Sequence, residues 1–141
     1  KPVNAIEKLF EVSQRVYEEL SRFNSMLIFE LKKYYEQLYN NYMKRNRANI
    51  QEKMKSNLKQ GISEGLYRSD VNIDLAVAVY VNSLVDMHNY ALSKTSNVNF
   101  EQVFEVMFDH HIRAISTPEG LSYYENRKKE ISNYLTKNNN V

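Results

Sequence analysis

Apolar residues recur at intervals of three and four positions through most of this chain, which is the period of a helix that buries one face. In the first segment, for example, Ile6, Leu9, Val16 and Leu20 fall on one stripe. No stretch alternates apolar and polar residues in the way a half-buried strand does. The pattern predicts an all-α multi-helix bundle, a single domain with helices over residues 3–21, 25–42, 47–65, 73–93, 99–116 and 118–135.

Residues that favour helix ends stand at the borders of these segments. Gly65 suits the left-handed conformation in which many helices end. The segment from Lys44 to Arg47 offers no apolar anchor, and we expect a bend or an exposed stretch there. Capping or first-turn residues precede the other predicted helices, at Pro2, Asn24, Ser25, Asn72, Asn99 and Thr117.

Two of the predicted helices are apolar on more than one side. Residues 73–92 carry two apolar faces, and residues 100–115 carry an apolar stripe that valines broaden. One small bundle leaves part of such a surface exposed, so we expect a second chain to cover it. We predict a two-fold homodimer with a four-helix interface that includes Val77, Val81, Val85, Leu92, Val103, Val106, His110 and Ile112.

Length and composition restrict the class of protein. The 141 residues suit one domain, and a chain of this size buries roughly 68% of its unfolded surface on folding. Cysteine is absent, which excludes disulfides and thiolate metal sites and agrees with a cytoplasmic location. No apolar run approaches the length of a membrane span, and no signal-peptide pattern opens the chain. Because the first residue is Lys, we expect a fragment of a longer protein.

The net charge of +2 is unevenly distributed. Residues 32–68 contain nine Lys or Arg and three Glu, a balance of +6, so the rest of the chain carries −4. A basic stripe attracts nucleic acid. Here the charges lie on the polar faces of helices with apolar seams, and we interpret them as a solvated surface.

Three segments resemble parts of the C-terminal halves of TetR-family transcriptional regulators. Residues 61–70, Gly-Ile-Ser-Glu-Gly-Leu-Tyr-Arg-Ser-Asp, resemble the hinge in the middle of that domain. Residues 5–35, ending Leu-Lys-Lys-Tyr-Tyr, look like the segment that follows the DNA-binding domain, although Glu36 stands where the family often has Pro. Residues 108–120, ending Ile-Ser-Thr-Pro-Glu-Gly, are similar to the penultimate helix and the turn after it.

The resemblance implies the effector-binding and dimerisation domain of a bacterial transcriptional regulator. The family's N-terminal helix-turn-helix module has no counterpart in these residues, so operator DNA is expected to be bound only by the intact protein, as a dimer. The first helix, residues 3–21, would join the sensor to that module. An effector that favours one helix arrangement would change the spacing of the two recognition helices and so control operator binding.

We expect the effector site between the first helix, residues 50–62 and residues 73–92. Met and aromatic side chains suit a small apolar or amphipathic molecule, although any one of them more often forms part of an ordinary core. His88 is expected toward an edge of its helix. The predicted ligand-binding residues are Phe10, Tyr17, Met26, Phe29, Tyr42, Met54, Tyr80, Ser83, Met87, His88 and Phe108.

The motifs of catalysis and metal binding are missing from the sequence. His110 and His111 point about 100° apart on a helix and cannot hold one ion together. No phosphate-binding loop, nucleophile elbow or metal-binding helix pattern occurs. We therefore expect no enzyme, no cofactor and no metal. The alternative to a sensor is a helical interaction module that docks another protein without a small-molecule ligand.

Overall fold

The computed structural model describes residues 3–22, 25–92 and 97–139, and their side chains except for Ser25 and residues 133–139. These residues form helices and no named strand, with one antiparallel bridge between Tyr67 and Ser116. The all-α prediction is confirmed. The helices are α1 (Ala5–Ser21), α2 (Ser25–Tyr34), α3 (Glu36–Ser63), α4 (Ile73–Ala91), α5 (Phe100–Ile115) and α6 (Pro118–Asn139).

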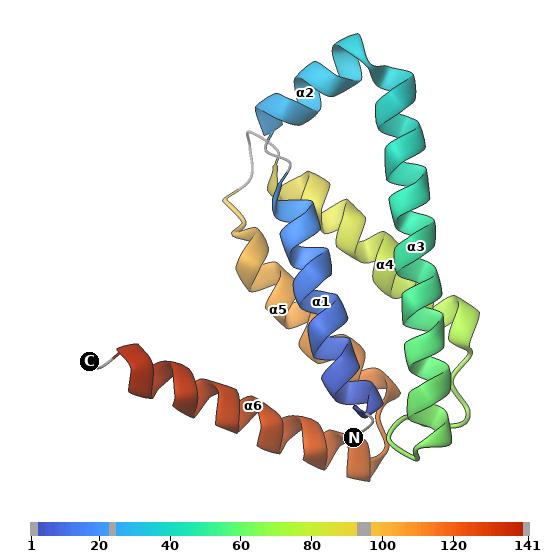
Figure 1. Ribbon diagram of the computed structural model, residues 1–141, viewed down its shortest axis with the longest axis vertical. Coiled ribbons are helices and arrows are strands. Elements are labelled where there is room, and N and C mark those ends of the chain that lie inside the picture. Colours follow the sequence, from blue (N-terminus) through green and yellow to red (C-terminus); the bar gives the residue numbers. More distant parts are fainter. Residues whose placement is uncertain (1–2, 23–24, 93–96, 140–141) are drawn as a thin grey trace.

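Four helices form the body of the bundle. The long helix α3 packs against α1 and α4, and α5 packs against α4 and α1 (Figure 1). At one end α2 links α1 to α3 and packs on α3. At the other end α6 begins close to the start of α1, and its far end points away from the bundle (Figure 1).

The molecule exposes more surface than a compact chain of its size. Its accessible surface is 9621 Å², whereas a folded monomer of this mass is expected to expose roughly 7,600 Å². The two arms formed by α2 and α6 account for the open shape, because each packs along only one or two neighbours. Considerable surface therefore remains available for a ligand or a partner.

The core follows the predicted stripes. In α1, the residues on the predicted face are buried, including the polar Ser13. Met54 and Leu58 of α3 meet the inner face of α4, where Val81 and Leu84 are almost fully buried. Helices α1, α3, α4 and α5 thus share one apolar core, and burial of these side chains is the main stabilising contribution.

The break between the second and third helices lies elsewhere than predicted. Residues 44–47 continue α3 without interruption, and the chain instead turns at Tyr35, whose φ and ψ are −137° and 42°. Lys and Arg have high helix propensity and, on an exposed face, need no apolar anchor. At the other end of the chain α6 continues to Asn139, four residues beyond its predicted end.

The predicted capping residues act as caps where the structure describes them. Asn72 and Asn99 accept hydrogen bonds from the N–H groups of Leu75 and Gln102, at 3.1 and 3.3 Å. Thr117 Oγ1 accepts from the N–H of Gly120 at 3.1 Å. Pro2 and Asn24 lie outside the described residues, and α1 is capped by Asn4. Ser25 is the first residue of α2.

Gly65 ends α3 in the predicted left-handed conformation, with φ of +75°. The N–H of Leu66 donates to the carbonyl of Gly61 at 2.9 Å, and the N–H of Gly65 donates to the carbonyl of Ile62 at 3.1 Å. This pair of bonds is a Schellman motif, which satisfies carbonyls that the helix end leaves free. It turns the chain sharply toward α4.

The turn after α3 packs against the turn before α6. The N–H of Arg68 donates to the carbonyl of Ile115 at 2.7 Å, and the N–H of Thr117 donates to the carbonyl of Leu66 at 3.0 Å. Gly120 lies so close that an added Cβ would come within 2.0 Å of the Leu66 carbonyl oxygen. Residues 61–70 and 108–120, two of the segments that carry the family resemblance, are therefore in direct contact.

Candidate functional site

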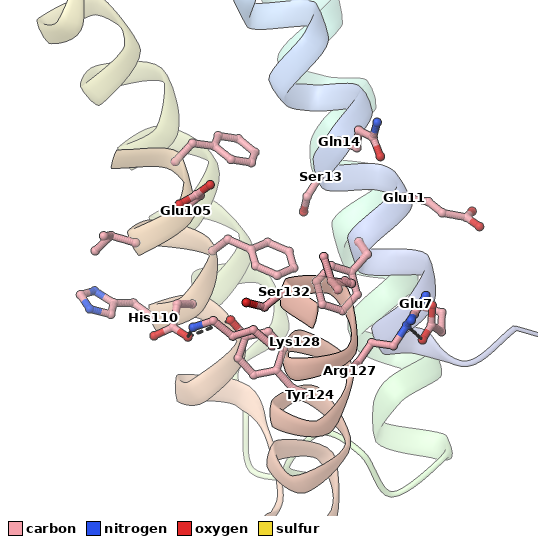
Figure 2. Close-up of a pocket in the computed structure, with 16 residues that line it drawn as sticks. Glu7, Glu11, Ser13, Gln14, Glu105, His110, Tyr124, Arg127, Lys128 and Ser132 are labelled. Carbon is pink, nitrogen blue, oxygen red and sulfur yellow. Dashed lines mark hydrogen bonds and ion pairs between the residues drawn. The ribbon is translucent and has the colours of Figure 1, made fainter. Parts of the chain in front are cut away.

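An open groove of about 910 Å³ lies between α1, α5 and the middle of α6. We call it the α1/α5/α6 groove. Figure 2 shows it with side chains from all three helices turned toward a common space. Its volume falls in the range of small-molecule sites, roughly 300–1,000 Å³.

Aromatic rings form the floor of this groove. The ring centroid of Phe10 lies 5.2 Å from that of Phe108 and 6.0 Å from that of Tyr124. Phe108 and Tyr124 are 6.2 Å apart, and Phe104 lines the same space. Each ring comes from the inward stripe of its helix, so three helices together present one aromatic surface.

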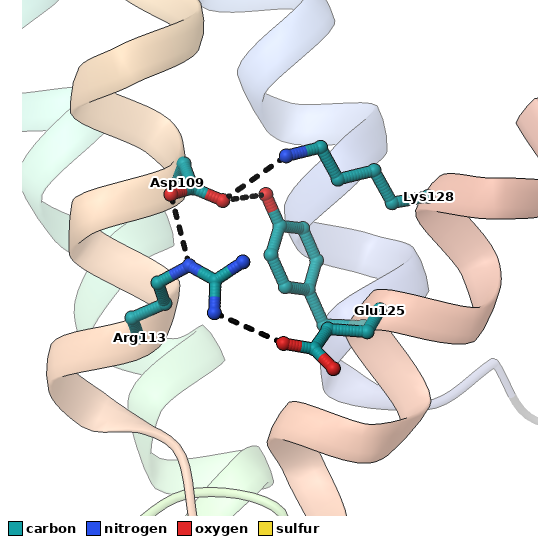
Figure 3. A network of polar contacts seen from close by, with 5 residues as sticks. Asp109, Arg113, Glu125 and Lys128 are labelled. Atoms are coloured by element: carbon teal, nitrogen blue, oxygen red, sulfur yellow. Dashed lines mark hydrogen bonds and ion pairs between the residues drawn. The ribbon is translucent and has the colours of Figure 1, made fainter. Parts of the chain in front are cut away.

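A network of charges closes the groove on the side of α5 and α6 (Figure 3). Asp109 accepts from Arg113 Nε at 2.9 Å, from Tyr124 Oη at 2.8 Å and from Lys128 Nζ at 3.3 Å. Arg113 also pairs with Glu125 at 3.0 Å. Desolvation acts to raise the pKa of Asp109, but the three donors outweigh it and lower the pKa to about 2. The carboxylate therefore stays ionised and holds α6 against α5.

A second set of contacts ties α6 to α1. Arg127 Nε lies 2.7 Å from Glu7 Oε1, and Tyr123 Oη donates to the same oxygen at 2.8 Å. Arg127 also pairs with Glu130 at 3.2 Å. Glu7 and Arg127 are far apart in sequence, so this pair reports the tertiary position of α6 relative to α1. A ligand in the groove would lie directly beside it.

A buried polar cluster lies between the helices behind the floor. The ring of His111 stacks on that of Tyr80 at 4.1 Å, and Ser13 faces the same region from α1. Burial raises the pKa of Tyr80, which the nearby Ser13 side chain opposes. The Ser13 and Tyr80 hydroxyl oxygens are nonetheless buried without a hydrogen-bond partner of normal geometry. Such orphaned groups are costly unless a ligand or water completes them.

His111 gives the fold a measurable pH dependence. Burial lowers its pKa from 6.5 to about 4, so between these pH values only the unfolded chain binds the proton. The free energy of unfolding is expected to fall by about 2–3 kcal/mol as the pH drops through this window. Urea denaturation at pH 7 and pH 4.5 measures the change. His111→Phe should remove the larger part of this change, and the second buried histidine, His88, whose pKa burial also lowers, accounts for part of the rest. His110→Gln, at an exposed site, should leave the change intact. An equal loss of stability between the two pH values in all three proteins would contradict the assignment.

A second groove, of about 530 Å³, runs between α4 and α5 on the other side of α5. We call it the α4/α5 groove. It is lined by Leu75 and Val79 on one side and Met107 on the other, with Tyr80 and His111 beneath. Leu75 and Val79 are 62% and 67% exposed, which confirms that α4 is apolar on more than one side.

The structure does not bring the predicted ligand-binding residues into one pocket. Two of them, Phe10 and Phe108, line the α1/α5/α6 groove, and another two, Tyr80 and Ser83, line the α4/α5 groove. The space predicted to hold the effector, between α1, α3 and α4, is instead filled by core side chains such as Leu58. A pocket cannot form there without opening the core.

The other predicted ligand-binding residues are dispersed. His88 is buried, not at an exposed edge, and packs against Phe100 at 4.9 Å; its burial lowers its pKa. Tyr17 stacks on Phe100 at 5.9 Å. Met54 is in the core, Met87 is half-buried, and Met26, Phe29 and Tyr42 are exposed on α2 and α3.

Half of the predicted dimer-interface residues are buried within the chain itself. Four of them form part of the core, namely Val77, Val81, Val85 and Ile112. In this conformation they cannot contact a second copy, because their side chains point into the core of their own chain. Leu92 and Val103 are half-buried, and Val106 and His110 are exposed.

Several groups of the groove were not predicted as site residues. Ser13 fell on an apolar stripe of the sequence, and a polar residue at such a position is the signal that could have found it. Tyr124, Arg127 and Lys128 lie on a helix with a weak apolar pattern and carry no local signal. Only the path of α6 across α1 and α5 assembles them.

Comparisons with known proteins leave the family open. Neither the protein-family models, nor the curated proteins, nor the solved structures searched contain a match to this chain. TetR-family membership therefore stays a prediction. Among the described residues, no group of His, Asp or Glu is placed to hold a metal ion. Nor does any helix in that part of the chain have the length and hydropathy needed to cross a membrane.

Proposed function

We propose that this chain is the ligand-sensing and dimerisation domain of a TetR-like transcriptional regulator, with the α1/α5/α6 groove as the sensor site. The observation that carries the proposal is that the start of α1 is attached both to the groove and to the hinge at residues 61–70. In the intact regulator α1 would lead to the DNA-binding module. A change in the groove would then act on the element that positions that module.

The attachment to the hinge is a chain of buried hydrogen bonds. Tyr67 Oη donates to Asn57 Oδ1 at 2.8 Å, and Asn57 Nδ2 donates to the carbonyl of Ala5 at 2.7 Å. Glu64 Oε1 accepts from the N–H of Ala5 at 2.8 Å. Asn57 and Glu64, from the last turns of α3, thus hold the first residue of α1, and Tyr67 from the turn after α3 holds Asn57. This linkage makes α1 and the hinge move together.

The attachment to the groove is the contact of Glu7 with Arg127 and Tyr123. A ligand that displaces α6 outward would lengthen this contact, whereas one that draws α6 inward would shorten it. Because the other end of α1 packs on α5 and α3, a change at Glu7 would tilt α1. The ligand shifts the balance only by its difference in affinity for the two arrangements.

Dimerisation is proposed along the α4/α5 groove. The exposed apolar side chains there are Leu75 and Val79 of α4, and Met107 of α5 lines the same groove and is half-buried. A second copy related by a two-fold axis would cover this surface with the same surface of its own. The four helices of such an interface are α4 and α5 of each copy, the same helices as in the sequence prediction. The contact residues differ, because most of those predicted point into the core and the proposed ones lie on the exposed side of the same helices.

Val79→Asp is expected to weaken the dimer at least tenfold, because the interface would bury an unpaired carboxylate. Sedimentation velocity over a concentration series measures the dissociation constant. Leu38→Asp is a matched control, since Leu38 is 68% exposed on α3, outside both grooves. A parent chain that stays monomeric at high concentration, or equal weakening by the two substitutions, would contradict the proposed interface.

The regulatory step is tested with the intact protein. Its affinity for operator DNA should change when a ligand occupies the α1/α5/α6 groove, and Arg127→Gln should reduce that change. Equal operator affinity with and without bound ligand would reject the proposal.

One observation favours the alternative of a ligand-free interaction module. Large apolar side chains are exposed along α2 and the start of α3, at Met26, Phe29, Tyr34, Tyr35 and Leu38. A contiguous exposed patch of this kind is typical of a protein-docking surface. A chain that is monomeric alone, binds no small molecule and forms a complex that Leu38→Asp disrupts would support this alternative.

A further inference from the structure

We propose that the α1/α5/α6 groove binds hydrophobic organic cations, molecules that combine apolar rings with a positive charge. This inference rests on the proposed sensor function and names the chemistry of the ligand. Four features of the groove support it: its charge balance, the pairing of its cations, its aromatic floor and a buried hydroxyl that has no partner.

The groove is negatively charged in a chain whose net charge is positive. Four carboxylates and two cations line it, for a balance of −2: Glu7, Glu11, Glu105, Asp109, Arg127 and Lys128. The side chains that pair with these residues from just outside, Arg113, Glu125 and Glu130, bring the balance to −3. A cation therefore gains electrostatic energy on entering, and an anion loses it.

The cations of the groove are already engaged, whereas two carboxylates are not. Arg127 pairs with Glu7, and Lys128 pairs with Asp109. Glu105 on α5 and Glu11 on α1 make no ion pair with any described residue. Figure 2 shows them on opposite sides of the groove, with Glu11 extending outward from α1. Glu105 is therefore the nearer counter-charge for a bound cation.

The aromatic floor suits the same ligand. A ring face attracts positive charge, most strongly where the contact is shielded from water. Tyr124 already shows the attraction, because Arg113 and Lys128 each lie 5.8 Å from its ring centroid. Phe10 also lines the groove, is only partly buried, and has no cation contact with any described residue. Its ring remains available to a ligand.

Ser13 supplies the polar group at the bottom of the groove. Its side chain is buried and lines the groove, and its hydroxyl oxygen lies near the Tyr80 side chain without forming a hydrogen bond of normal geometry. Figure 2 shows it pointing into the space between α1 and α5. A hydroxyl in this position can bond to a donor or acceptor on a ligand, which would remove the cost of leaving it unpaired.

Two ions of nearly the same shape and opposite charge test the inference. Isothermal titration of the chain with tetraphenylphosphonium and with tetraphenylborate compares their affinities directly. We expect the cation to bind at least ten times more tightly. Raising the salt concentration should narrow the difference, because the carboxylates are partly exposed. Equal affinities, or tighter binding of the borate, would overturn the inference.

Substitutions locate the bound cation. Glu105→Gln is expected to weaken tetraphenylphosphonium binding about threefold, the effect of one partly exposed charge, and to leave tetraphenylborate binding no weaker. Glu52→Gln, on α3 and outside the groove, should change neither. Phe10→Leu should weaken cation binding about tenfold through loss of a ring face. Circular dichroism checks that each variant is folded, and if Phe10→Leu is not, the loss of cation binding in Glu105→Gln alone decides the site.

The two proposals fail in different ways. If the chain dimerises through Val79 but binds neither ion, the cation proposal is rejected and the regulator proposal stands. If the chain is monomeric and binds tetraphenylphosphonium with the expected Glu105 dependence, the cation proposal stands and the regulator proposal is rejected. Binding that persists unchanged in Glu105→Gln and Phe10→Leu places the ion elsewhere and overturns the site.

Discussion

Gly120→Ala is expected to lower the free energy of unfolding by about 3 kcal/mol or more, or to prevent folding. An added Cβ would meet the Leu66 carbonyl oxygen at 2.0 Å and the carbonyl carbon at 2.9 Å, and both are backbone atoms that no side-chain rotation can move. Overpacking of this kind typically costs about 1–3 kcal/mol, and more where backbone must shift. Relieving the clash would also disturb the bond from Thr117 to Leu66. Thermal and urea denaturation measure the loss.

Gly65→Ala is the matched control. No atom lies within 4 Å of a Cβ at that position, so only its φ of +75° is unfavourable for alanine. The cost should be about 1 kcal/mol. Comparing the stability losses of the two variants separates two reasons for a glycine. At position 120 another backbone segment lies too close for a side chain, and at position 65 the φ angle is positive. If both variants lost the same stability, the contact between the hinge and the start of α6 would not be as tight as described.

Asn57→Ala should be the second large effect, with a loss of about 3 kcal/mol. The substitution leaves the buried Tyr67 hydroxyl without a partner, which costs about 1–3 kcal/mol, and it removes the side-chain bond to the Ala5 carbonyl, which then keeps only its helical partner. Asn57 itself is buried on the inner face of α3. Asn82→Ala, on the exposed face of α4, should change stability by no more than about 0.5 kcal/mol. Urea denaturation compares the two variants.

A double-mutant cycle shows whether Tyr67 and Asn57 stabilise the fold together. Tyr67→Phe alone removes one bond, and combined with Asn57→Ala it should cost less than the sum of the two single changes by about 1 kcal/mol. Strict additivity would mean that the Tyr67 to Asn57 bond adds no stability. In the intact protein the same variants should also weaken the response of operator binding to ligand, because they loosen α1 from the hinge.

The helices and most of their ends were predictable because their causes are local. Asn72, Asn99 and Thr117 cap helices through N–H groups only three residues ahead, and Gly65 ends α3 by its own conformation. The break at Tyr35 was missed, since neither its position nor the continuity of residues 44–47 has a strong local signal. An exposed helix with a weak apolar pattern is held by its neighbours more than by its own sequence.

The candidate site was less predictable than the helices. Apolar periodicity correctly predicted that α4 and α5 are apolar on more than one side. It did not predict which of these sides faces the core. The structure turns Val77 and Val81 toward the core and Val79 toward solvent, a rotation of the helix that depends on its packing against α3 and α5. Periodicity alone leaves such a choice open when both faces are apolar.

The sequence by itself determined that this protein is helical, where most helices begin and end, and that two of them carry more apolar surface than one face. Only the tertiary structure decided the site. Glu7 meets Arg127 and Asn57 meets Ala5 across separations of 120 and 52 residues, and Phe10, Phe108 and Tyr124 form one floor from three helices. Helix formation depends on neighbours three or four residues away, whereas a groove depends on how whole helices cross, which many distant contacts settle together.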